Sequence, residues 1–416
     1  MEVARPALAE GALRVVRSRD FVAYVVAFVA FDLAGQIQSV AIAWQVYAVR
    51  HSALDLGLVG LASFSPSLLL APVSGLVADR VDRRRIIAIA SVVQIAVCAA
   101  LIPLGAVHGV RALALILTVL FVAGTARAFR YPASGSLLPL IVPAERFVRA
   151  NASATAFREV ITVGGPALGG LLVAAGSAAA YGIAMLTFAI GAVAVVAIAL
   201  PARVHASSPF AWSDLLGGMR YLQRTPVLAG AISLDLFAVL FGGASALLPI
   251  YAAQIFHVGP VGFGALRAAD AFGTAACAVM LARHPIHRRA GPRLLGAVAA
   301  FGAATVVFGL SRSIWIALPA LAVIGAADMI SVAIRNALIA LRTPDEMRGR
   351  VSAVSGTFIV ASNELGQFES GAVAALVGAV PSVVIGGVGT LLVVALWAWR
   401  NPALRRADAI AAPAEG

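Results

Sequence analysis

The sequence predicts an all-α polytopic membrane protein with about twelve transmembrane helices in two pseudo-symmetric six-helix bundles. First, 61% of the 416 residues are hydrophobic and only 12% are charged, whereas soluble domains are about 25% charged. Second, the apolar residues fall in blocks of about 20, the length that crosses a bilayer core. Third, the arginines gather in alternate connections, which places both termini in the cytoplasm by the positive-inside rule.

The predicted spans follow the apolar blocks along the chain. Pro72, Pro132 and Pro249 lie inside blocks and can kink their helices where neighbouring groups satisfy the freed carbonyls. The predicted spans are Phe21–Val49, Leu54–Ala78, Ile86–Val107, Leu113–Leu140, Ala152–Ala175, Ala179–Leu200, Val227–Phe256, Val261–Leu281, Leu294–Leu310, Ile314–Leu341, Val351–Val380 and Ser382–Trp399.

The longest connection between blocks, Pro201–Thr225, separates the two halves. Its centre places Trp212, Leu215 and Met219 near one helical face, which predicts an amphipathic helix over Trp212–Gln223 on the membrane surface. A plain linker is the alternative interpretation. The predicted organisation is a first bundle over 1–200, a cytoplasmic linker over 201–226, a second bundle over 227–400 and a cytoplasmic tail over 401–416.

The two halves also repeat weakly. Val142-Pro143-Ala144-Glu145 is matched 201 residues later by Thr343-Pro344-Asp345-Glu346, and Asp32 is matched 203 residues later by Asp235. Repeated halves are typical of transporters whose binding site lies between the repeats near the bilayer midplane. Chance similarity between two apolar sequences is the alternative.

Charged residues inside the apolar blocks are the main functional candidates, because each costs about 2.5–3.5 kcal/mol to insert at bilayer depth. Asp32 lies about 16 Å into the first block, and Gln36 and Ser39 share its helical face. This polar stripe predicts either a central cavity or a hydrogen-bonded seam between helices. The proposed proton- and substrate-handling set is Asp32, Gln36, Arg127, Arg158, Glu159, Asp235, Asp328 and Arg335.

Within this set, Asp32 is the favoured proton carrier, and Arg127 is the favoured partner for a substrate anion or a proton relay. The structural alternative is a brace between the two halves near their cytoplasmic ends, formed by Arg158, Glu159, Glu364 and Glu369. Further charged residues in the apolar blocks are Arg130, Arg267, Asp270, Glu364 and Glu369.

The loop Gly75–Arg85, GLVADRVDRRR, ends one apolar block and begins the next. Its positive charge is a topology signal. It is also a candidate cytoplasmic gate, whose predicted residues are Gly75, Asp79, Arg80, Arg83 and Arg84.

A second motif lies in the fifth block, where Gly165, Pro166, Gly169 and Gly170 combine a kink with a smooth surface. Small residues let membrane helices approach closely, so this stretch predicts a pivot, with generic packing as the alternative.

These motifs resemble those of the major facilitator superfamily, whose loop between helices two and three reads G-x-L-a-D-r-x-G-r-k. Gly75, Asp79 and Arg80 match, while Asp82 replaces the second glycine. The resemblance implies that Asp79 faces the N-terminus of helix eleven and clamps one state, and that the fifth-helix motif is that of antiporter branches. The fourth-helix basic motif is matched only by Arg127.

A narrower resemblance covers nearly the whole chain. RDFVAYVVAF, QIQSVAIAWQVYAV, ARAFRYPASGSLLPLIVP and RTPDEMRGRVSAV are similar to the bacterial efflux branch that includes the enterobactin exporter. The resemblance implies a multi-pass protein of the bacterial cytoplasmic membrane that exports a siderophore or drug-like molecule in exchange for protons.

The function classes that compete with this one are a facilitator or importer of the same fold and a receptor that does not transport. An enzyme is not expected, because the sequence has no nucleophile–base pair, metal-ligand cluster or phosphate-binding loop. We expect no cofactor beyond the proton gradient, and no metal. Expected partners are a small-molecule substrate, protons and membrane lipids rather than nucleic acid, since the net charge of +12 resides in loops between apolar blocks. We expect a monomer.

Overall fold

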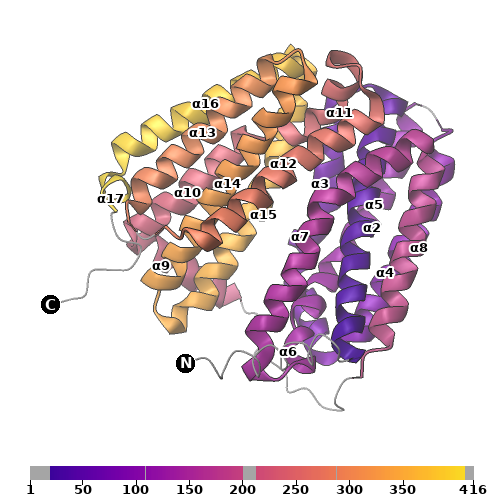
Figure 1. The fold of residues 1–416 in the computed structure, drawn as a ribbon, viewed down its shortest axis with the longest axis horizontal. Coiled ribbons are helices and arrows are strands. Elements are labelled where there is room, and N and C mark those ends of the chain that lie inside the picture. The colour runs from indigo at the N-terminus through magenta and orange to yellow at the C-terminus, as the bar shows by residue number, and fades with distance from the viewer. Residues whose placement is uncertain (1–18, 108, 200–211, 287, 408–416) are drawn as a thin grey trace, which may run out of the picture. The chain divides into compact units, whose positions relative to one another are not determined.

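The computed structural model of the protein describes residues 19–107, 109–199, 212–286 and 288–407, which are almost entirely helical (Figure 1). Eleven helices in the described part of the chain are long and apolar enough to cross a membrane. A further helix, α15 (Asp345–Val377), is 33 residues long but carries acidic and basic residues along its length. The prediction of an all-α polytopic protein is confirmed, and the count of twelve spans and the side of the termini stay predictions.

The chain forms two compact units, here called unit 1 (Met1–Gln45 and Ala62–Phe210) and unit 2 (Val46–Leu61 and Ala211–Gly416). Helix α3 contributes to both units; in its first part, Gly57 lies against the backbone of Phe368. The helices of the first half are α2 (Arg19–Arg50), α3 (Ala53–Arg80), α4 (Arg83–Leu104), α5 (Val110–Gly135), α6 (Leu138–Ile141), α7 (Ala144–Ala175) and α8 (Ser177–Val196).

The second half contains α9 (Trp212–Arg224), α10 (Pro226–Phe241), η1 (Ala244–Leu247), α11 (Leu248–Ile250), η2 (Tyr251–Ile255), α12 (Gly259–Arg283), α13 (Ala290–Leu310), α14 (Ile314–Arg342), α15, α16 (Ala379–Arg400) and α17 (Pro402–Arg405). Most predicted spans agree with these bounds to within a few residues. The largest boundary error is at α7, which starts eight residues before the predicted Ala152 because the helix begins directly after Pro143.

Two spans that were predicted as continuous are broken in the structure. The predicted span Leu113–Leu140 ends at Gly135, shortly after Pro132, and resumes as the short α6. The predicted span Val227–Phe256 stops at Gly242 and continues through a 3-10 turn and a π turn. At this break, a side chain on Gly243 would lie only 2.2 Å from the carbonyl oxygen of Gly366, so the close approach to α15 requires glycine.

A buried amide network connects the helices of unit 1. Gln38 Nε2 donates to Gln94 Oε1 at 3.1 Å, and Gln94 Nε2 donates to the carbonyl oxygen of Ala123 at 3.0 Å. Farther along α2, Gln45 accepts a hydrogen bond from Tyr181 at 2.5 Å. Hydrogen bonds between helices replace the hydrophobic driving force that is lacking in lipid, so this face of α2 is a structural seam with α4 and α8, and α4 is bonded in turn to α5.

Helix α9 has the helical range that the sequence predicts, and its contact with the membrane surface stays a prediction. Where its side chains are described, it packs on protein within unit 2. Leu222 is only 4% exposed, and Tyr221 Oη donates to the carbonyl oxygen of Arg342 at 2.9 Å. A side chain on Gly218 would lie 2.7 Å from the carbonyl oxygen of Arg350, so glycine allows α9 to contact α15 closely. The side chains of residues 212–216 lie outside the described set.

Candidate functional site

The most exposed ion pair within the membrane helices of unit 1 joins α2 to α7. Arg158 Nε donates to Asp32 Oδ2 at 2.5 Å, and the two side chains are 52% and 21% exposed. Asp32 lies about 20 Å along α2 from its first residue at 1.5 Å per residue, so the pair lies deep within the helix. The predicted stripe therefore includes a seam between α2 and α7 whose charged atoms still reach open space. Arg158 has its partner inside unit 1, and Glu159 follows it as a half-buried residue.

The small residues of α7 bring the backbones of α2 and α7 close together. A side chain on Gly165 would lie 2.7 Å from Cβ of Gln36, and one on Gly169 would lie 3.3 Å from Cα of Ile37. Gly165, Pro166, Gly169 and Gly170 are all buried. Packing therefore explains the glycines by itself, and motion about a pivot stays a prediction.

Two further arginines extend the charged site of unit 1. Arg130 on α5 interacts electrostatically with Asp32, Arg127 and Arg158. Its guanidinium carbon lies 5.3 Å from the ring centroid of Phe31 and 5.8 Å from that of Tyr131, which is within cation–π range. These four charged residues and the two aromatic rings form what we call the arginine cluster. Arg127 Nη2 is also 3.5 Å from the carbonyl oxygen of Ser63.

Unit 2 contains a buried ion pair between Asp235 on α10 and Arg335 on α14, whose side chains are 6% and 1% exposed. Ser331 Oγ donates to Asp235 Oδ1 at 3.0 Å, so Asp235 has both an ion-pair and a hydrogen-bond partner. Arg335 Nη1 makes an ion contact rather than an aligned hydrogen bond, and its Nε has no hydrogen-bond partner among the described residues. The sequence-predicted residues Asp235 and Arg335 are therefore brought together.

Asp328, one turn before Ser331 on α14, lines a cavity of about 10 Å³ with Asp235 and Phe301, about the smallest cavity that can hold one water molecule. It interacts electrostatically with Asp235, Arg335 and Asp270, and Asp270 interacts with Arg267 on the same helix, α12. We call these five charged residues of unit 2 the acidic cluster.

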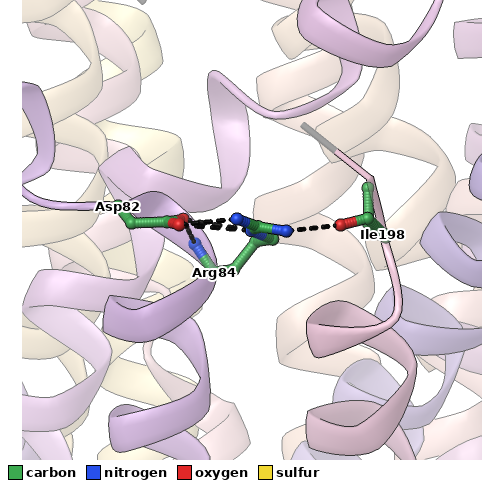
Figure 2. A network of polar contacts seen from close by, with 3 residues as sticks. All are labelled: Asp82, Arg84 and Ile198. Atoms are coloured by element: carbon green, nitrogen blue, oxygen red, sulfur yellow. Dashed lines mark hydrogen bonds and ion pairs between the residues drawn. The ribbon is translucent and has the colours of Figure 1, made fainter. Parts of the chain in front are cut away.

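The basic loop forms a local capping arrangement, which Figure 2 shows. Asp82 is the N-cap of α4 and accepts a hydrogen bond from the backbone N–H of Arg84 at 2.9 Å. Arg84 Nη1 in turn donates to the carbonyl oxygen of Ile198, just beyond α8, at 2.7 Å. The hydrogen bond from the Arg84 side chain lowers the pKa of Asp82 below the ordinary aspartate value. Asp82 therefore caps α4 through its side-chain carboxylate, an acceptor that the glycine of the family motif lacks.

The structure describes the positions of three of the four remaining predicted gate residues. Gly75 and the exposed Arg80 lie in the last turns of α3, and Arg83 is buried at the start of α4. The side chain of Asp79 lies outside the described set, so its lock to helix eleven stays a prediction. Sequence reasoning missed the role of Asp82, although an Asp directly before a basic-apolar block is an ordinary N-cap signal. In the described residues, no group of His, Cys, Asp or Glu could hold a metal ion.

Comparisons with known proteins agree with this architecture. The family described as "Transmembrane secretion effector" matches residues 11–415. The enterobactin exporter EntS of Citrobacter koseri is 27% identical over 383 residues, which cover 90% of this chain and 88% of that protein. Macrolide efflux protein A of Streptococcus pyogenes is 22% identical over 337 residues, which cover 79% of this chain and 83% of that protein.

Solved transporters share the fold. A bacterial homologue of the iron transporter ferroportin superposes with a TM-score of 0.73 at 14% identity, over 93% of this chain and 99% of that chain. A bacterial homologue of the human lysosomal transporter Spinster gives a TM-score of 0.69 at 13% identity, over 92% of this chain and 96% of that chain. At these identities the likeness shows the fold alone. With the family match over nearly its whole length, the chain belongs to the transmembrane secretion effectors of the major facilitator superfamily, and is a multi-pass protein of the bacterial inner membrane.

Proposed function

We propose that the protein is a proton-coupled exporter that moves a siderophore or drug-like small molecule out of the bacterial cytoplasm by alternating access. Export is supported by relatives that are named as an enterobactin exporter and a macrolide efflux protein. The energy source is the proton gradient, the working unit is a monomer, and no cofactor is required. The single observation that carries proton coupling is the charge balance of the acidic cluster in unit 2.

The acidic cluster contains one more carboxylate than it has guanidinium groups. Asp235, Asp270 and Asp328 face only two arginines. Because charges at membrane depth are expensive unless they are paired, the excess negative charge favours uptake of a proton.

Asp328 is the group of this cluster that is best placed to exchange the proton. Asp235 is already held by Arg335 and Ser331, and Asp270 has Arg267 on its own helix. Asp328 lines the small cavity together with Asp235 but is not itself in the Arg335 ion pair, and a water molecule there could carry a proton to or from its carboxylate. Deprotonated Asp328 attracts Arg335 within α14, so protonation of Asp328 favours the pairing of Arg335 with Asp235 on α10. A proton can thereby bias the packing of α10 against α14.

Asp32 is the alternative proton carrier, and the sequence pattern favours it. Its carboxylate is held by Arg158, so a proton must compete with a guanidinium for the same oxygens. This makes Asp32 better suited to control whether Arg158 is available than to hold the coupling proton. The vesicle assay described next distinguishes Asp328 from Asp32 as the proton carrier.

The test uses everted membrane vesicles that contain the full chain, with enterobactin and a macrolide as probes. We expect an acid-inside pH gradient to drive accumulation of at least one probe, and nigericin with potassium to abolish it. Asp328→Asn should remove the dependence on the pH gradient while movement down a substrate gradient persists. Glu145→Gln is the control, because Glu145 is an exposed acid in the first turn of α7, outside both charged clusters.

Each other outcome has a defined meaning. If Asp32→Asn rather than Asp328→Asn removes the pH dependence, Asp32 carries the proton. If accumulation needs no pH gradient, the protein is a facilitator. If neither probe moves under any gradient, the proposed substrate classes are wrong.

A further inference from the structure

We infer that the arginine cluster of unit 1 binds an organic anion with an aromatic or apolar body, so that the exported molecule is negatively charged. The inference rests on the proposed export function and names the substrate class of its binding site. It depends on the charge, exposure and aromatic surroundings of Arg127, Arg130 and Arg158.

The arginine cluster has the opposite charge balance to the acidic cluster. Three guanidinium groups on α5 and α7 face a single carboxylate, that of Asp32. At membrane depth, two uncompensated positive charges are costly, and helix packing does not require them because neutral amides hold the other face of α2. A bound anion offsets this cost.

The guanidinium group of Arg158 is available in geometry as well as in charge. The Arg158 side chain is 52% exposed although it is ion-paired, so an incoming anion can take the place of Asp32 beside it. An arginine presents a planar fork of donors that matches carboxylate, phosphate or phenolate oxygens in pairs. Two such forks can hold one anionic group.

The surroundings of the arginines fit a ligand with a ring or an apolar body. Arg130 lies over the rings of Phe31 and Tyr131, and the side chain of Tyr131 is itself 68% exposed. Phe157, the neighbour of Arg158 on α7, is 52% exposed. Exposed aromatic faces beside cations provide stacking surface for a flat ligand.

An anionic substrate also has an energetic consequence for export. A negative charge that leaves a cell with a negative interior is driven outward by the membrane potential. Inward proton movement is favoured by the same potential. Export of the anion and import of the proton are therefore driven in the same sense by the membrane potential.

The test uses the purified full chain in lipid nanodiscs and two xanthene dyes of opposite charge, the anion fluorescein and the cation tetramethylrhodamine methyl ester. Fluorescence anisotropy measures their affinities. We expect fluorescein to bind more tightly, and its affinity to fall at least tenfold in Arg158→Gln and Arg130→Gln. Arg111→Gln is the matched control, because Arg111 is an exposed arginine at the other end of α5. Arg158→Lys should restore only part of the affinity, since the charge remains and the planar fork is lost.

The inference is overturned if fluorescein does not bind, if the cationic dye binds as tightly, or if Arg158→Gln binds fluorescein like the wild-type protein. Size-exclusion chromatography of each variant distinguishes loss of a site from loss of the fold. The assay involves no gradient, so fluorescein binding without proton-driven export in vesicles would refute the proposed coupling and leave the anion site intact. The reverse pattern would refute the anion site alone.

Discussion

Asp32 and Asp235 are aligned by the predicted repeat of the two halves, yet their ion pairs differ in exposure and in partner. In unit 1, Asp32 pairs with Arg158 on α7, and the two side chains are 21% and 52% exposed. In unit 2, Asp235 pairs with Arg335 on α14, and both are almost fully buried. The same acid on the first helix of each half is thus joined to the fifth helix in one half and to the fourth in the other.

The difference in exposure gives the two ion pairs different roles. A half-exposed pair contributes little to stability, about 0–1 kcal/mol, and its arginine can be taken by a ligand. A buried pair is strongly destabilising to break, because the remaining charge is left without a partner. Unit 1 therefore has the properties of a binding site, and unit 2 those of a closed core with one excess carboxylate.

The largest expected effect is the loss of the buried pair. Asp235→Ala should destabilise the protein by about 3–5 kcal/mol, because Arg335 stays buried and unpaired. The thermal unfolding midpoint in detergent measures this loss. The double variant Asp235→Leu with Arg335→Met should recover most of it, since two apolar residues leave no uncompensated charge. A double variant that is as unstable as Asp235→Ala would refute this account of the pair.

A smaller effect is expected where α7 contacts α2. Gly165→Ala should cost about 1–3 kcal/mol, because the new methyl group overlaps Cβ of Gln36 in a packed contact. Gly164→Ala is the control on the same helix: no atom lies within 4 Å of its Cβ position, and alanine favours a helix by about 1 kcal/mol over glycine. Opposite shifts in the unfolding midpoint are expected. Equal shifts would show that the α2–α7 contact is loose.

The smallest effect concerns the surface pair of the basic loop. Asp82→Ala should cost about 1 kcal/mol through the lost N-cap of α4, and Asp82→Asn less. Because the pKa of Asp82 is lowered in the folded protein, its contribution is present above the ordinary aspartate pKa and is lost only as the pH falls through the lowered value. The difference in unfolding midpoint between wild type and Asp82→Ala should be the same at pH 5 and pH 8. A difference that disappears at pH 5 would contradict this assignment.

Most of the fold could be predicted because apolar length and arginine placement act locally along the sequence. The breaks near Pro132 and at Gly242 were harder, since the first depends on the local turn and the second on how closely Gly243 approaches α15. The amphipathic pattern of α9 predicts its helical range but cannot show whether lipid or protein covers its apolar face, so its contact with the membrane stays a prediction. The residues of the candidate site were identified as membrane-depth charges. The ion-pair partners of these charges depend on which helices lie side by side, and the apolar periodicity of a single sequence does not show that.

The division of roles between the two units is tested most directly by proton release on substrate binding. Purified protein in weakly buffered solution is mixed with fluorescein, and a pH electrode records the protons that appear. We predict that the wild-type protein binds the dye and releases protons, and that Asp328→Asn binds it with similar affinity and releases none. Proton release by Asp328→Asn that equals that of the wild-type protein would contradict the assignment of the anion to unit 1 and the proton to unit 2.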